Sequence, residues 1–419
     1  MNILVISQET WTEKTNGGNV LSNIFKNFDT ANFAQIYCSA GLPENSICSR
    51  YFQLSDRLML KNQFRIINSQ DIVSDPNDTE MVGRSLRSGI FREVLLLARE
   101  AAWSIINWKS EALKNFILDF HPDIIFAPCY SYIHTSKIAL YAQELTACPV
   151  ISYISDDNYS CKRISFSPSF WINRFITRKY IRKLFAKSRL IYTMTQNQID
   201  EYEPIFNVKM KILCKGGKPA VEKTTVNNPI RLIYGGGLYL NRWKILAEIK
   251  KALENVNKDG IKAQLHIYSS TELPEKVRNK LNDNENSFLF PAISYEKLMS
   301  EYKNSDIALH VEAFDKKNLS YTRLSFSTKI VDCLSSGCAT VAVGPEGQAG
   351  IDYLEANDGA VCIRDKNEIA EKITELINHP ETILQYSKKA AELLIKNHSE
   401  EVISEMVKND FEEIFENEK

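Results

Sequence analysis

Two groups of residues in the second half of the chain could hold a phosphate. The first is the triple glycine at 235–237, which ends a β-branched run and is followed five residues later by Arg242. The second is Ser327-Thr328-Lys329, which starts an apolar-periodic segment. Backbone amides of a glycine loop, and hydroxyls and cations at a helix start, favour anions. Each group alone also fits a plain turn or a capped helix, but two in one region favour a diphosphate-type ligand.

Asp332 follows Lys329 by three residues, which places both on nearly the same side of the predicted helix. A carboxylate there could accept hydrogen bonds from ribose hydroxyls, and a surface Lys–Asp pair is the alternative. The glycine loop lacks the Gly-Lys-Ser/Thr of a Walker loop and the spacing of a dinucleotide fingerprint. These residues therefore predict phosphate binding outside the standard motifs.

Three features of the first half follow predicted strands. Gly17-Gly18 opens an apolar helical segment, Asp156-Asp157 ends the run VISYIS, and His134 follows the run IIFAP. Paired glycines let a ligand approach the backbone, and acids at a strand end can bind sugar hydroxyls or transfer protons. A plain turn, helix-capping acids and a structural histidine are the alternative interpretations.

The elements that must position these residues alternate in the manner of parallel sheets wrapped by helices. In the first half the predicted strands are Ile3–Ser7, Gln35–Cys38, Asp123–Ala127, Val150–Ile154, Leu190–Thr193 and Lys211–Cys214. In the second half they are Arg231–Tyr234, Gln264–Tyr268, Phe288–Phe290, Asp306–His310, Thr340–Val343 and Ala360–Ile363. In open sheets of this kind ligands bind beyond the carboxyl ends of the strands, which is where the candidate residues lie.

The stretch 215–229, KGGKPAVEKTTVNNP, has no apolar periodicity and is rich in turn-forming residues, so it predicts a linker. We therefore predict two doubly wound domains of α/β class, at 1–214 and 230–382. Residues 383–419 predict amphipathic helices that pack back toward the first domain.

Composition narrows the classes of function. The 419 residues include 51 Lys and Arg and 52 Asp and Glu, and a net charge of −1 argues against whole-surface nucleic-acid binding. Nine scattered cysteines without a Cys-x-x-Cys pair, and six dispersed histidines, predict neither disulfides nor a metal site. The chain has no signal-peptide pattern and no apolar run of about 18 residues. We expect a cytoplasmic protein, soluble or peripheral at the inner face of the membrane.

The charge is unevenly distributed. Residues 1–214 hold 24 basic and 20 acidic side chains, and the remainder holds 27 and 32. Between Asp157 and Asp200 there are nine basic residues and no acid, interleaved with aromatic and apolar side chains. A second apolar stretch, 85–108, contains or adjoins Arg84, Arg87, Arg92 and Arg99. Such segments bind anionic lipid, so an anionic membrane surface is an expected partner, and core-facing helices with a basic outer face are the alternative.

Taken together, these residues make the chain resemble the GT-B glycosyltransferases, specifically the large retaining family 4. The resemblance spans nearly the whole length and rests on six ordered segments. They are 1–7 with Gly17-Gly18, 121–128, 149–157, 234–243, 290–309 and 327–347. The resemblance implies two Rossmann-like domains that face a central cleft, with a nucleotide-sugar donor held mainly by the second and an acceptor bound by the first.

The resemblance also implies roles for particular residues. The donor diphosphate would be held by Gly236, Gly237, Arg242 and Lys329, with further phosphate contacts from Ser327 and Thr328. Asp332 would contact the ribose, Gly17 and Gly18 would lie against donor phosphate or acceptor, and Asp156 would sit near the transferred sugar.

One departure from the family pattern concerns its motif of two glutamates separated by seven residues. The first position falls on Leu324 and the second is Asp332. Glu312 or Asp315 could substitute for the missing glutamate, because the passage that contains them is longer than usual.

The sequence thus predicts a metal-independent, retaining glycosyltransferase of hexosyl type that requires no cofactor. Its donor is expected to be a UDP-sugar, and its acceptor a glycan, including a lipid-linked or cell-surface polysaccharide. One alternative is a GT-B nucleotide-sugar epimerase with acid/base groups among Asp156, Asp157 and His134. Another is a catalytically weak glycan-binding partner subunit.

Overall fold

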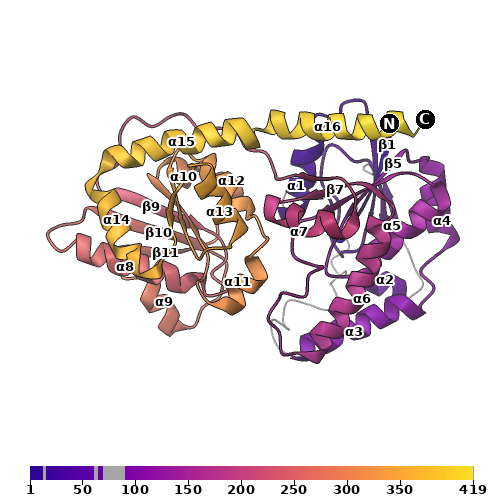
Figure 1. Ribbon diagram of the computed structural model, residues 1–419, viewed down its shortest axis with the longest axis horizontal. Coiled ribbons are helices and arrows are strands. Elements are labelled where there is room, and N and C mark those ends of the chain that lie inside the picture. The colour runs from indigo at the N-terminus through magenta and orange to yellow at the C-terminus, as the bar shows by residue number, and fades with distance from the viewer. Residues whose placement is uncertain (13–15, 61–64, 69–89, 419) are drawn as a thin grey trace. The chain divides into compact units, whose positions relative to one another are not determined.

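The computed structural model describes residues 1–12, 16–60, 65–68 and 90–418. It divides into two compact units (Figure 1). The first unit comprises Met1–Leu213 and Ser404–Lys419, and the second comprises Cys214–Ile403. Each unit is an α/β structure with its own sheet.

The sheet of the first unit has the strand order β4-β3-β2-β1-β5-β6-β7-β8. The strands are β1 (Asn2–Ser7), β2 (Asn32–Tyr37), β3 (Arg50–Gln53), β4 (Arg65–Asn68), β5 (Ile124–Pro128), β6 (Val150–Ile154), β7 (Ser188–Thr193) and β8 (Met210–Ile212). All neighbours are parallel except β3 and β4. The six strands predicted for this half are confirmed. β3 and β4 were not predicted, because four residues each are too few to show a hydrophobic period.

Helices flank this sheet, which explains why its central strands are apolar on both faces. They are α1 (Asn16–Phe25), α2 (Asp56–Leu60), α3 (Ile90–Ile105), α4 (Glu111–Phe120), α5 (Ile133–Thr146), α6 (Pro168–Phe185) and α7 (Gln196–Phe206). Several start at residues that favour helix N-termini: Ser110 and Thr195 accept a backbone hydrogen bond at the starts of α4 and α7, and Pro168 opens α6.

The sheet of the second unit is parallel throughout, with the order β11-β10-β9-β12-β13-β14. The strands are β9 (Ile230–Gly235), β10 (Ala263–Ser269), β11 (Ser287–Pro291), β12 (Ile307–Val311), β13 (Ala339–Val343) and β14 (Val361–Ile363). All six strands predicted for this half are confirmed. The helices are α8 (Arg242–Val256), α9 (Glu275–Leu281), α10 (Tyr295–Lys303), α11 (Lys316–Thr322), α12 (Thr328–Leu334), α13 (Ala349–Ala356), α14 (Ile369–Asn378) and α15 (Pro380–His398).

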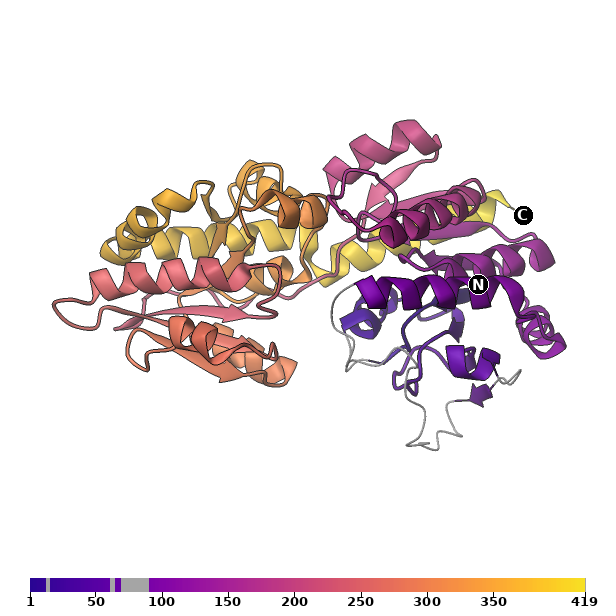
Figure 2. The same cartoon turned by 90° about the horizontal axis from the view of Figure 1, so that it is seen from below.

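Apolar cores lie on both faces of this second sheet, and helices cover each (Figure 2). Leu309 on β12 packs in the core that also contains Ile245 of α8. The neighbouring residue Ala308 packs on the opposite face with Cys333 of α12. Successive side chains of a strand point to opposite faces of its sheet. His310, two residues after Ala308, therefore points to the same face as Ala308, which is the face that α12 covers.

The last helix, α16 (Glu400–Asn417), belongs to the first unit from Ser404 onward. Phe411 is fully buried and its ring lies 5.7 Å from Phe25 and 6.1 Å from Phe126. Tyr192 donates a 2.7 Å hydrogen bond to Asp410. Of the predicted region 383–419, α15 is thus part of the second unit, and most of α16 completes the core of the first.

The segment 215–229 belongs to the second unit rather than forming a free spacer. The Gly217 amide donates to His398 O at 2.8 Å, and the Glu400 amide donates to Gly217 O at 3.2 Å. Asn227 hydrogen-bonds to Asp306 at 2.9 Å. The chain therefore passes between units at 213/214 and again at 403/404. Across the described residues, no helix combines the length and hydropathy that a bilayer crossing requires.

Candidate functional site

The glycine loop and the Ser-Thr-Lys segment come together in the second unit. β9 ends at Gly235 and α12 begins at Thr328, and the Lys329 side chain lies directly over Gly236. A Cβ added to Gly236 would stand 2.1 Å from Lys329 Nζ, and the φ of Gly236 is 150°. The backbone conformation therefore favours glycine at this position, and a side chain here would displace the Lys329 ammonium.

Lys329 is the second cation at this edge of the sheet. In the part of the chain that the structure describes, no carboxylate pairs with Nζ, which lies 5.3 Å from the centroid of the Tyr234 ring. Burial, together with repulsion from Arg242, lowers the pKa of Lys329 to about 8. A bound anion would favour the charged form, so this ammonium group is suited to a phosphate.

Arg242, the first residue of α8, is held by a buried carboxylate. Its Nη2 lies 2.6 Å from Glu312 Oε1 and its Nε lies 3.2 Å from Oε2. Burial opposes the charge of Arg242, but Glu312 more than offsets this and raises the pKa of the guanidinium above its usual value. Since the Glu312 carboxylate is only 3% exposed, the pair is a desolvated, bidentate one. Arg242 is thus oriented and charge-balanced, whereas Lys329 is not.

The long passage between β12 and α12 supplies two acids that support this site. Glu312 follows β12 directly and holds Arg242. Asp315 caps α11 and accepts a 3.0 Å hydrogen bond from Asn241, whose left-handed backbone leads into α8. Leu324, the position of the first family glutamate, is buried instead. Glu312 therefore provides a carboxylate that contacts one of the predicted phosphate-binding residues, Arg242.

Asp332 does not pair with Lys329. Its Oδ1 lies 2.5 Å from Lys215 Nζ and accepts a 3.0 Å hydrogen bond from Tyr295 Oη. The surface Lys–Asp pair considered for residues 329 and 332 is therefore wrong, because Lys329 turns toward Gly236 while Asp332 turns toward the segment that enters the second unit.

The remaining predicted residues of this unit lie at the same edge of the sheet. Ser327 is the N-cap of α12 without a side-chain hydrogen bond to the helix, and Thr328 is its first residue. Gly237 packs so closely against Tyr239 that a Cβ would lie 2.1 Å from the ring, and its carbonyl accepts a 2.7 Å hydrogen bond from Tyr234.

His310 was not among the residues singled out from the sequence. It lies near the end of β12 and is buried, and its Nε2 has no hydrogen-bond partner among the described atoms. Burial, reinforced by Arg242 and Lys329, lowers its pKa to about 3. The imidazole is therefore neutral beside two cations. Its place at the carboxyl end of a predicted strand, where ligands of such sheets bind, is the sequence feature that could have indicated His310.

In the first unit the two adjacent acids differ in environment. Asp156 is exposed just after β6. Asp157 is buried and accepts hydrogen bonds from the Ser160 amide and from Tyr202 Oη, each at 2.8 Å. Asp157 is thus engaged in the local structure, which weakens its candidacy as an acid/base group. Neither acid caps a helix, since the next helix, α6, begins at Pro168 and has Ser167 as its N-cap.

The buried side chain of His134 contacts two partly exposed polar residues, Gln8 just after β1 and Arg99 of α3. Its Nε2 is 2.5 Å from Gln8 Oε1 and 3.4 Å from Arg99 Nη2, and its ring stacks on Trp103. Burial, with Arg99 and Lys137, lowers its pKa well below the usual value. Glu100 accepts a 3.0 Å hydrogen bond from the first amide of α5, and burial raises its pKa to about 7. No pattern in the sequence indicated Gln8 or Glu100 as site residues.

The structure provides no side-chain evidence for some of the residues predicted in the first half of the chain. Gly17 and Gly18 lie in α1, whose first side chains are not described, and Arg84 and Arg87 lie outside the described residues. Within the described ranges, no three His, Cys, Asp or Glu side chains gather as a metal site.

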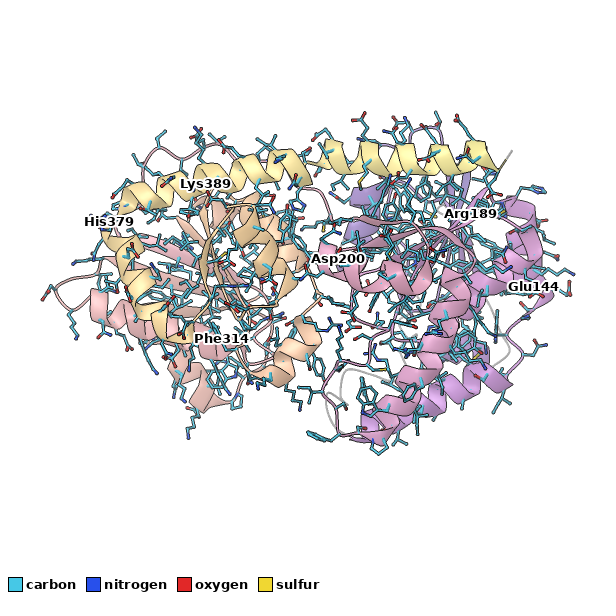
Figure 3. The ribbon with its side chains drawn as sticks, viewed as in Figure 1. Glu144, Arg189, Asp200, Phe314, His379 and Lys389 are labelled. Carbon is cyan, nitrogen blue, oxygen red and sulfur yellow. The ribbon has the colours of Figure 1, made fainter. Side chains whose placement is uncertain are left out.

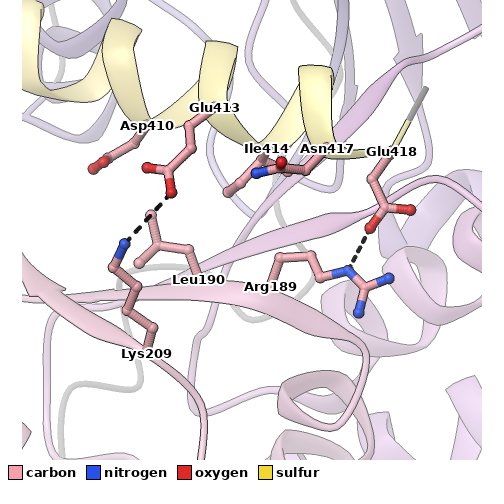
Figure 4. A pocket seen from close by; sticks show the side chains of 8 residues that line it. All are labelled: Arg189, Leu190, Lys209, Asp410, Glu413, Ile414, Asn417 and Glu418. Carbon is pink, nitrogen blue, oxygen red and sulfur yellow. Dashed lines mark hydrogen bonds and ion pairs between the residues drawn. The ribbon is translucent and has the colours of Figure 1, made fainter.

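A hollow of about 400 Å³ lies beside α16 in the first unit (Figure 4). Arg189, at the start of β7, lies close to this helix (Figure 3) and pairs with Glu418 at 2.6 Å. Lys209 and Glu413 form a second pair at 3.9 Å. Asp410, which also lines the hollow, pairs with Lys211 outside it. The charged side chains of this hollow thus all have partners in the first unit, and it contains none of the candidate residues.

A sequence model of the glycosyl transferase-like family matches residues 242–406, which contain Arg242, Glu312 and Lys329. No curated protein matches the sequence.

Solved structures match over the whole chain. Sucrose-phosphate synthase from Thermosynechococcus elongatus has 12% identity and a TM-score of 0.64, with 99% of both chains covered. An α,α-trehalose-phosphate synthase (UDP-forming) from Burkholderia xenovorans, in complex with glucose-6-phosphate, has 10% identity and a TM-score of 0.62 over 99% of this chain and 100% of the other. Anabaena HepE, in complex with UDP and glucose, has 12% identity and a TM-score of 0.62 over the same shares. These likenesses establish the GT-B glycosyltransferase fold.

Proposed function

We propose that the protein is a glycosyltransferase of hexosyl type that takes its sugar from a nucleotide-sugar donor. The observation that carries this proposal is the Lys329 ammonium, which has no carboxylate partner among the described residues and lies over Gly236, close to the oriented guanidinium of Arg242. Two cations at the carboxyl end of a Rossmann-like sheet suit a diphosphate. The family match over residues 242–406 and the fold support the same assignment.

The donor in this proposal is a UDP-sugar. UDP is bound in the structure of Anabaena HepE, and UDP-2-fluoro glucose in the Escherichia coli trehalose-6-phosphate protein, both of which share this fold. Asp332 would contact the ribose, and Ser327 and Thr328 would contact phosphate. Arg242 and Lys329 provide the positive charge that a metal ion provides in other transferases, so the reaction requires no metal or other cofactor.

The proposed reaction retains the configuration of the sugar by front-face substitution. The bond from the anomeric carbon to the diphosphate oxygen breaks, and the negative charge that develops there is stabilised by Lys329 and Arg242. The acceptor hydroxyl forms the new bond on the same face, and its proton passes to the departing phosphate. Asp156 would lie near the transferred sugar.

The acceptor is proposed to bind the first unit. The polar cluster of Gln8, Arg99 and His134 is near the carboxyl ends of β1 and β5, where ligands of open sheets bind. A growing glycan, including a lipid-linked one at an anionic membrane surface, is the acceptor that the basic segment 162–189 favours.

Hydrolysis of a panel of UDP-, GDP- and ADP-sugars tests the proposal. One donor is expected to be hydrolysed, and Lys329→Ala is expected to lower the rate by at least about a hundredfold. Lys317→Ala, which removes an exposed lysine from α11, is the matched control. If no donor is hydrolysed or bound, or if the two variants behave alike, the proposal is wrong.

A further inference from the structure

The exposed side of α6 is apolar at its beginning and cationic toward its end. Phe166, just before the helix, is 96% exposed, and Ile172 and Phe175 on its first turns are 52% and 60% exposed. We call these three residues the α6 apolar end. Large apolar side chains at this exposure, grouped at the start of one helix, mark an interaction surface.

The same side of the helix continues with lysines. Lys179 follows Phe175 by four residues, and Lys183 follows by another four, so all three lie along one side of α6. Lys187 is exposed just beyond the helix. In the described part of the chain, none of the three lysines has a carboxylate within ion-pair distance. We call these three residues the α6 lysines.

The opposite side of α6 is committed to the first unit. Ile181, Leu184 and Phe185 are buried, and the helix packs against α3 and α5. Arg174 and Arg178 donate to the carbonyls of Asp157 and Tyr159. Intramolecular packing therefore accounts for the buried side and for these two arginines, but not for the α6 apolar end or the α6 lysines.

Charge identifies the occupant of this surface. No Asp or Glu occurs from residue 158 to 199, whereas nine Lys and Arg do. A protein partner of mixed charge would not require so complete an absence of acids, whereas an anionic bilayer repels every acid and attracts every base. Aromatic side chains beside lysines are the composition of a segment that lies in the membrane interface.

We infer that α6 docks the protein on an anionic lipid surface, with the α6 apolar end inserted at the acyl boundary and the α6 lysines against the head groups. This inference rests on the proposed function only in placing the acceptor at a membrane. The docking itself is measured without turnover, so its failure and a failure of the proposed activity can be distinguished.

The full chain is sedimented with vesicles of phosphatidylcholine alone or with roughly a third phosphatidylglycerol, which supply the anionic surface charge. Binding is expected only to the anionic vesicles, and it should weaken as salt rises from about 0.1 to 1 M. The triple variant Lys179→Ala, Lys183→Ala, Lys187→Ala should bind about a hundredfold more weakly, at about fivefold for each lysine. Phe166→Ser with Phe175→Ser should lower binding at least about tenfold.

Two matched controls remove the same groups from the second unit. Lys258→Ala with Lys262→Ala and Lys276→Ala removes three exposed lysines, and Val221→Ser removes a side chain that is 90% exposed. Both should bind vesicles as the original chain does, and all variants should keep its far-UV circular dichroism and donor hydrolysis.

The inference is overturned by equal binding of neutral and anionic vesicles, by no binding to either, or by variants of α6 that bind like the controls. Sedimentation velocity without lipid provides one further outcome. A dimer that Phe166→Ser with Phe175→Ser dissociates would assign this surface to a second copy of the chain instead of a membrane.

Discussion

Arg242 and Glu312 form a bidentate, buried ion pair whose two nitrogen–oxygen distances are 2.6 and 3.2 Å. The pair joins the start of α8 to the end of β12 and orients the guanidinium toward the carboxyl edge of the sheet. Lys329, by contrast, forms no ion pair with any carboxylate in the described part of the chain. Because Arg242 is paired with a carboxylate and Lys329 is not, substitutions at the two residues should have different effects on stability and on nucleotide binding.

Glu312→Gln removes the carboxylate but keeps the shape. The Arg242 charge then remains buried without its partner, and we expect the free energy of unfolding to fall by about 3 to 5 kcal/mol. Urea titration measures the change. Asp315→Asn is the control, because Asp315 is exposed and should cost about 1 kcal/mol at most. An equal loss in both variants would show that the Arg242–Glu312 pair is no stronger than a helix cap.

Gly236→Ala should displace Lys329. The new methyl group would occupy the position of the ammonium, and the φ of 150° adds backbone strain of about 1 to 3 kcal/mol. Gly260→Ala is a matched control, since Gly260 also has positive φ, at 122°, but no atom within 4 Å of the added Cβ. Both variants should lose stability, and only Gly236→Ala should lose nucleotide affinity. Loss of affinity in both would mean that strain alone explains the effect.

Nucleotide affinity should fall at alkaline pH. The pKa of Lys329 is lowered to about 8, so the cation is present below that pH and is lost as the pH rises through it. We expect the Kd for UDP to rise by up to tenfold per pH unit above about 8. Lys329→Arg keeps its charge over this range, and its Kd should stay level. A profile that is the same for both proteins would show that another group titrates.

Asp332 has a second oxygen free of the Lys215 and Tyr295 contacts, which both involve Oδ1. If Oδ2 accepts a ribose hydroxyl, UDP should bind about tenfold more tightly than 2′-deoxy-UDP. Asp332→Asn should reduce that ratio, whereas Lys215→Met should lower the free energy of unfolding and leave the ratio unchanged. Calorimetric titration measures both. A wild-type ratio of one would remove Asp332 from the ribose site.

The sequence predicted the strands that carry the site, because buried parallel strands form continuous β-branched runs. It also predicted that Gly236, Arg242 and Lys329 would lie at one sheet edge. It did not predict the partner of Arg242, since Glu312 lies 70 residues away and neither spacing nor periodicity links such distant residues. The partner of Asp332 was also not predicted, because Lys215 lies 117 residues away in a segment whose composition is typical of a linker.

The first unit was harder to predict. His134 was identified from its place after a strand, but Glu100 lies on a helix surface and becomes buried only when α3 meets the start of α5. Asp156 and Asp157 are neighbouring residues of the same type, and only the folded structure shows that Asp157 is buried while Asp156 is exposed.

The central claim is that Lys329 binds the phosphates of a nucleotide donor, and calorimetric titration of UDP, GDP and ADP into the full chain tests it most directly. We predict that one nucleotide binds, that Lys329→Ala weakens its binding by about tenfold or more, and that Lys317→Ala does not. No binding by any nucleotide, or an unchanged Kd in Lys329→Ala, would contradict the account.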